Sequence, residues 1–138
     1  MITKLRWKNC FCFRGEHEIS LGAGVFAVTA RYEDQDGRSN WGGKSSLMKL
    51  LGTMPFFGWH GQDLEDNWIT EGEDSAFYEI TLDTGARIRR ERTRGKSTQI
   101  LFWEGGRKIG QKGAQREIEA YIGLSEADFF ASCRSEER

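Results

Sequence analysis

The feature that most constrains the fold of this chain is a short segment with two glycines, a lysine and two serines. It lies between an apolar segment and a segment with helical periodicity. Residues 38–46 read Arg-Ser-Asn-Trp-Gly-Gly-Lys-Ser-Ser. The apolar run 25–28 before them favours a buried strand, and three leucines at helical spacing follow them before Gly52, which can end a helix. A glycine-rich loop between a strand and a helix can surround an anion, because loop amides and the helix N-terminus point at one place. The sequence therefore predicts a phosphate-binding loop at 38–46.

Each residue type in this loop has an expected role. The Lys44 ammonium would reach the β and γ phosphates of a nucleotide, and the Ser45 hydroxyl would ligate Mg²⁺. Trp41 could stack on a base or lie over the start of the helix. The predicted nucleotide-binding residues are Ser39, Asn40, Trp41, Gly42, Gly43, Lys44, Ser45 and Ser46.

The loop departs from the full pattern G-x-x-x-x-G-K-[ST] in two places. The pattern requires glycine where the chain has Arg38, and Gly37 comes one residue early. Residues 31–36 also lie between the strand and the loop, where such folds usually turn at once. The alternative interpretation is a glycine-rich turn that happens to contain a lysine.

Motifs on both sides of the loop follow an order known from one family of ATPases. The first is an "N-F-x-S-F"-like segment, followed by "G-x-N-x-x-G-K-S-S-L" and "I-x-x-x-x-G-L-S-x-x-D-F-F". They are carried by Asn9, Phe11 and Phe13, by Asn40 and residues 43–47, and by residues 118–130. With these motifs the chain resembles the N-terminal lobe of the ABC-type ATPase head of SMC, SbcC and related DNA-repair proteins. The resemblance covers nearly the whole chain but only half of the family's head.

The resemblance implies an α/β fold, namely a P-loop NTPase half-domain. Its mixed β-sheet would carry a small antiparallel β-subdomain and flanking helices, in a single domain over residues 1–138. ATP and Mg²⁺ are the implied ligands, with Ser45 on the metal. Glu137 falls where the family has a glutamine that contacts Mg²⁺ and the attacking water.

The resemblance also indicates what the chain lacks for catalysis. Nothing in it resembles the family's signature motif or the strand ending in Asp-Glu that supplies the general base, so no catalytic residue is predicted. Hydrolysis is expected only with a C-terminal lobe and a second head. A lobe of this kind should expose an apolar patch, in residues 127–133 or in the helix after Lys44, and should self-associate or bind a second polypeptide.

Two alternatives stay open. One is a non-catalytic homologue that binds or blocks a partner head, which Arg38, Glu137 and the residues inserted after Ala30 favour. The other is a DNA-binding module that uses an arginine-rich hairpin. Within a strand meander at 76–103, four cations share one face at strand period: Arg90, Arg92, Arg94 and Lys96. Otherwise the hairpin's cations, which include Arg87 and Arg89 on the opposite face, would pair with nearby acids, namely Glu79, Asp83 and Glu91.

Composition and charge limit the partners and the cell compartment to be expected for this chain. A net charge of −1 gives no general attraction to nucleic acid or membranes. The sequence has no apolar stretch near the roughly 20 residues of a membrane span, and no signal-peptide pattern. Three cysteines, an odd number, argue against a disulfide scaffold and favour the reducing cytosol, so we expect a cytoplasmic protein.

Periodicity predicts the remaining elements. A strand is expected over 2–13, with Cys10 and Cys12 on one face, and residues 54–75 are expected to form a long surface loop. Near the C-terminal end, one helix would end at Gly123 and a second would be capped by Ser125. The apolar stripe of the first helix consists of Ala114, Ile118, Tyr121 and Ile122.

Overall fold

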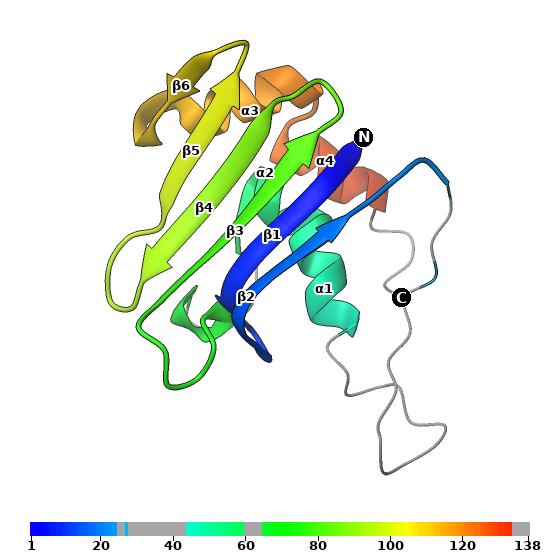
Figure 1. Ribbon diagram of the computed structural model, residues 1–138. Coiled ribbons are helices and arrows are strands. Elements are labelled where there is room, and N and C mark those ends of the chain that lie inside the picture. Colours follow the sequence, from blue (N-terminus) through cyan, green and yellow to red (C-terminus); the bar gives the residue numbers. More distant parts are fainter. Residues whose placement is uncertain (25–26, 28–43, 60–64, 134–138) are drawn as a thin grey trace.

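The computed structural model describes residues 1–24, 27, 44–59 and 65–133 (Figure 1). In this part of the chain, six antiparallel strands form one sheet in the order β2-β1-β3-β4-β5-β6. The strands are β1 (Ile2–Cys10), β2 (Phe13–Ser20), β3 (Ser75–Leu82), β4 (Arg87–Thr93), β5 (Gln99–Glu104) and β6 (Arg107–Ile109). The helices are α1 (Lys44–Leu51), α2 (Thr53–Phe57), the 3-10 helix η1 (Glu65–Trp68), α3 (Gln111–Ile122) and α4 (Glu126–Cys133).

The α-helices lie on one side of the sheet, so the fold has two layers (Figure 1). Helix α1 contacts β1, α2 contacts β3 and β4, and α3 contacts β5 and β6. The combination of one sheet with flanking helices is therefore confirmed. The predicted mixed sheet is not seen among the described strands, because all of their pairs are antiparallel. The predicted antiparallel meander is not a separate small subdomain, because β3 pairs with β1 and makes one continuous sheet with the N-terminal hairpin. The strand predicted at 25–28 falls almost wholly outside the described residues.

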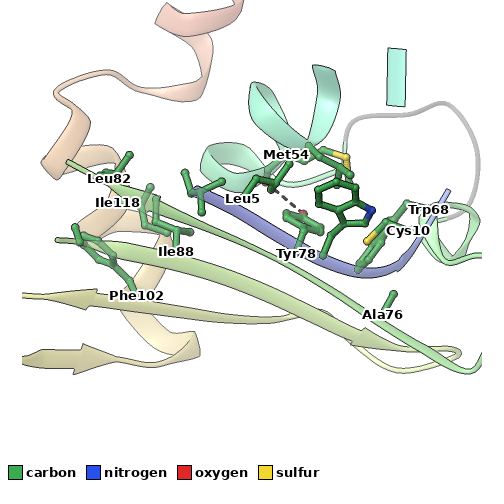
Figure 2. Close-up of a cluster of buried hydrophobic side chains, with 14 of the residues drawn as sticks. Leu5, Cys10, Met54, Trp68, Ala76, Tyr78, Leu82, Ile88, Phe102 and Ile118 are labelled. Carbon is green, nitrogen blue, oxygen red and sulfur yellow. Dashed lines mark hydrogen bonds between the residues drawn. The ribbon is translucent and has the colours of Figure 1, made fainter. Parts of the chain in front are cut away.

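The core lies between the sheet and the helices (Figure 2). Strand alternation brings apolar side chains of neighbouring strands into register: Leu5 lies opposite Ile80, Ile80 opposite Ile88, and Ile88 opposite Phe102. All four are buried to within 1% of full burial. The Tyr78 hydroxyl joins the two layers by donating a hydrogen bond to the carbonyl oxygen of Met54 over 3.3 Å.

The single strand predicted over 2–13 is wrong, because the chain turns after Cys10 and Phe13 opens β2. Asn9 holds this turn. Its Oδ1 accepts a hydrogen bond from the Gly15 amide over 2.7 Å, and its Nδ2 donates to the carbonyl of Ser75 over 3.3 Å. As a result Cys10 is buried whereas Cys12 is exposed in the turn, so the two thiols do not share a face.

The long surface loop predicted over 54–75 is also wrong. Helix α2 lies within it, and Pro55 is tolerated there because it lies in the first turn, where backbone amides have no partner inside the helix. The 3-10 helix η1 ends at Trp68, which is fully buried and packs edge-on against Tyr78 with ring centroids 5.1 Å apart. A sequence rich in glycine and acids thus supplies one of the largest core side chains.

The predicted helices at the C-terminal end are confirmed. Ala114 and Ile118 of α3 are fully buried, and the helix ends at Gly123, whose φ of 75° is accessible to glycine at little cost. The Ser125 Oγ accepts a hydrogen bond from the Asp128 amide over 3.2 Å and so caps α4.

Candidate functional site

The N-terminus of α1 carries the described part of the predicted phosphate-binding loop. Lys44 is the first residue of this eight-residue helix, Ser45 is exposed and Ser46 is half-buried. Leu50 on the other side of the helix is fully buried and fixes α1 against the core. Residues 39–43 and Glu137 lie outside the described residues.

The charge at this helix start is unusual. The first turn holds Lys44 and contains no acidic side chain. A cation at a helix N-terminus opposes the helix dipole, so a lysine there contributes nothing favourable to the helix itself. An anion bound at the same place would interact favourably with both the lysine and the dipole.

The face of β4 that was predicted to carry a row of exposed cations is largely covered by other elements. Arg90 is only 3% exposed. Its Nε donates to the carbonyl of Pro55 and its Nη2 to that of Phe56, both over 3.0 Å, and Nη2 also donates to Gln115 Oε1 over 2.5 Å. Burial lowers the pKa of the Arg90 guanidinium. Arg90 therefore fastens α2 and α3 to the sheet and is not part of an exposed ridge.

Arg92 is tied to η1 in a similar way. Its Nε donates to Asp66 Oδ1 over 2.7 Å and its Nη1 to Glu65 Oε2 over 2.9 Å. The Thr98 hydroxyl donates to the other carboxylate oxygen of Glu65 over 2.6 Å. The hydrogen bond from Arg92 lowers the pKa of Asp66.

The remaining two cations of the predicted ridge are exposed. Arg94 donates to the carbonyls of Glu73 and Thr70, over 3.1 and 3.3 Å, which holds its side chain along the loop before β3. Lys96 lies in the turn between β4 and β5. Of the four candidate DNA contacts, Arg94 and Lys96 are therefore the exposed ones.

On the opposite face of β4, the arginines pair with acids as the alternative interpretation predicted. Arg89 Nη1 lies 3.4 Å from Glu79 Oε2, and Arg87 Nη1 lies 3.7 Å from Glu79 Oε1. A second nitrogen of Arg89 lies 3.3 Å from Glu91 Oε2. Asp83 instead pairs with the N-terminal ammonium of the chain, over 3.2 Å.

A pocket of about 670 Å³ opens beside Arg90, between the end of α2 and the β4–β5 turn. Gly58, Trp59, Lys96 and Ser97 are among the residues that line it. Sequence reasoning did not find this pocket, because its walls come from segments some 40 residues apart that carry no common motif. The one feature of the sequence that pointed towards this pocket was the strand alternation that placed Arg90 and Arg92 on one face.

The described side chains of α1 and of residues 124–129 do not form the broad apolar patch expected near α1 and α4; those of Phe130, Ser132 and Cys133 lie outside the described ones. Among the described residues, the large hydrophobic side chains that stand out as exposed are Met1, Met48 and Leu124. Met48 belongs to α1 and Leu124 precedes α4, so both lie in the expected regions without forming a wide surface. The described residues also contain no group of three or more His, Cys, Asp or Glu side chains placed to hold a metal ion.

No protein-family model matches this sequence, and no curated protein matches it significantly. Within the described part of the chain, every helix is too short or too polar to cross a membrane.

Proposed function

We propose that this chain binds Mg-ATP through residues 38–46, as the N-terminal half of an SMC- or SbcC-like DNA-repair ATPase head. The observation that carries the proposal is Lys44 at the first position of α1, directly after Gly42 and Gly43. In a loop of this type, two glycines followed by a lysine at a helix start bring together backbone amides, a point charge and the positive end of the helix dipole. The triphosphate is the ligand that these three features bind together.

In this proposal each side chain has one role. The Lys44 ammonium binds the β and γ phosphates, and the exposed Ser45 hydroxyl would hold the Mg²⁺ ion that bridges them. Glu137 is a further candidate near the metal. The bound Mg²⁺ would neutralise charge on the phosphates, and hydrolysis would depend on a C-terminal lobe and a second head that supply the general base and the signature motif.

The order of elements supports the proposal. An N-terminal antiparallel hairpin, a helix that starts with Lys44, an antiparallel meander and two further helices follow one another as the resemblance implies. Self-association or a complex with a C-terminal lobe belongs to the same proposal. Met48 and Leu124, 53% and 42% exposed, are apolar side chains in the regions expected to make such a contact.

Two alternatives have observations of their own. Arg38, where the loop pattern has glycine, favours a homologue that binds or blocks a partner head without catalysis. Exposed Arg94 and Lys96 favour a DNA contact at the β4–β5 turn.

Calorimetric titration with Mg-ATP tests the proposal. We expect saturable binding by the natural chain and no detectable binding by Lys44→Ala, whose circular dichroism spectrum should match that of the natural chain. The matched control is Lys112→Ala, which removes an exposed lysine from α3. Binding of Mg-ATP by Lys44→Ala as tight as that of the control would refute the proposal.

A further inference from the structure

Arg90 is a buried cation whose partners in the described part of the chain are all neutral. Its hydrogen bonds go to two backbone carbonyls and to the side-chain amide of Gln115. Arg90 is only 3% exposed, and it forms no ion pair with a carboxylate of the described residues. Burial lowers its pKa, and this effect is larger than that of Glu65 and Glu126, which act on its charge without contact and tend to raise the pKa. Buried guanidinium groups are generally paired with an anion, because an uncompensated charge in the interior destabilises the fold.

One nitrogen of this guanidinium is still available. Nε and Nη2 donate to the oxygens just named, whereas Nη1 donates to none of the described residues. Arg90 also lines the pocket of about 670 Å³. Gly58 forms the wall beside Nη1, and a Cβ at that position would lie 3.6 Å from this nitrogen, in ordinary van der Waals contact. The absence of a side chain at residue 58 therefore leaves space in front of Nη1 for a ligand atom.

The other charges of the pocket reinforce this positive site. Lys96 and Ser97 line the pocket from the β4–β5 turn, and Lys96 is exposed. The carboxylate that lines the pocket, Glu65, is already engaged by Arg92 over 2.9 Å and by the Thr98 hydroxyl over 2.6 Å. Arg90 and Lys96 thus remain as cations without a carboxylate partner among the described residues.

We propose that this pocket binds the phosphate group of a small molecule. The Nη1 of the Arg90 guanidinium and the Lys96 ammonium act as charged donors. The Ser97 hydroxyl is a third donor. A phosphate suits donors that converge from different walls, because its terminal oxygens each accept hydrogen bonds in different directions. Trp59 and Ile100 provide an apolar wall against which the organic part of such a ligand would lie. None of the residues that line the pocket belongs to the loop at 38–46, and the proposal does not depend on the function proposed for that loop.

A titration with sodium phosphate, followed by ¹H–¹⁵N NMR, tests the proposal. It uses the Lys44→Ala variant, so that phosphate binding at the N-terminus of α1 does not contribute to the shifts. We expect saturable shifts of the amide signals of residues 95–98 and of the Arg90 Nε–H signal. Lys96→Ala should weaken phosphate binding by about tenfold, since it removes one charge-assisted hydrogen bond. The matched control is Lys108→Ala, whose ammonium lies 5.6 Å from the Trp103 ring, and it should leave the affinity unchanged.

A second arm identifies the source of the phosphate. Tighter binding of adenosine monophosphate than of orthophosphate, with a shift of the Trp59 indole N–H signal, would support an organic phosphate. Equal affinities would support inorganic phosphate. Shifts no larger than those caused by sodium chloride at the same ionic strength, or equal binding of phosphate and acetate, would overturn the proposal. Arg90→Gln should also weaken phosphate binding. If this variant does not fold, the amide shifts of residues 95–98 and the affinity of Lys96→Ala still test the proposal.

Discussion

Arg92 Nε donates a hydrogen bond to Asp66 Oδ1 over 2.7 Å, and this pair ties β4 to the 3-10 helix that ends at the buried Trp68. The carboxylate also accepts a hydrogen bond from the Gly95 amide over 3.2 Å, so it fixes the β4–β5 turn as well. One side chain of an irregular segment thus positions both a core tryptophan and a wall of the pocket beside Arg90.

The Asp66 contact should make stability depend on pH. Because the hydrogen bond from Arg92 favours the charged form, the pKa of Asp66 in the folded protein lies below its ordinary value. Its contribution to stability is therefore present above about pH 4, the unfolded pKa, and is lost as the pH falls through the lower folded value. We expect Asp66→Asn to lower the free energy of unfolding at pH 7, and the difference from the natural chain to shrink toward pH 3.

Urea denaturation at pH 7, 5 and 3 measures this difference. The control is Asp74→Asn, which alters an exposed carboxylate and should change stability little at any of these pH values. An Asp66→Asn variant as stable as the natural chain at pH 7 would contradict the assigned role.

Asn9→Ala should destabilise the fold by about 1–3 kcal/mol, because the Gly15 amide loses its acceptor and the Ser75 carbonyl loses a donor. The φ of 54° at Asn9 adds to the cost, since alanine tolerates this region less well than asparagine. Chemical denaturation measures the change, with the exposed Asn67→Ala as the control. Equal effects of the two substitutions would count against a special role of Asn9.

The two N-terminal cysteines should differ in reactivity. Burial raises the pKa of Cys10 to about 12, whereas Cys12 is exposed. Because the thiolate is the reactive form, we expect iodoacetamide at pH 8 to modify Cys12 and to spare Cys10 in the folded protein. Mass spectrometry of a Cys133→Ser variant measures this, and unfolding in urea should make both react. Fast modification of Cys10 in the folded state would show that the β1–β2 turn opens readily.

The pure chain should not turn over ATP. The expected reason is the lack of a general base and of a second head that closes on the nucleotide. Release of phosphate from Mg-ATP should match the buffer background, with Lys44→Ala as the comparison. If the natural chain turned over ATP steadily and Lys44→Ala abolished this activity, the proposal that the chain is only the N-terminal half of an ATPase head would be refuted.

Several elements follow from local patterns and were predicted correctly. The end of α3 at Gly123, the Ser125 cap of α4 and the β-meander at 76–103 each depend on residues close to one another in the sequence. The helix predicted from the spaced leucines before Gly52 is of the same kind. Short-range hydrogen bonding and apolar periodicity are sufficient to specify them.

The errors have a different origin. The alternation of apolar residues continues past Cys10 and so hides the reversal of the chain there. Asn9 holds the turn through the nearby Gly15 amide and through the carbonyl of Ser75, far along the chain. The segment 54–75 reads as a loop because its polar residues are numerous. Its structure depends on Trp68 entering the core beside Tyr78, which the neighbours of Trp68 in sequence do not reveal.

The arginines of β4 show what the sequence determines by itself and what only the tertiary structure decides. Strand alternation alone determined that Arg90 and Arg92 point to one side and Arg87 and Arg89 to the other. Which side would meet solvent was decided only in three dimensions, because α2 and α3 deliver carbonyl and amide oxygens to Arg90 from residues 25 to 35 positions away. A charge pattern specifies faces, but the partners that bury or expose a face come from distant segments whose packing depends on the whole core.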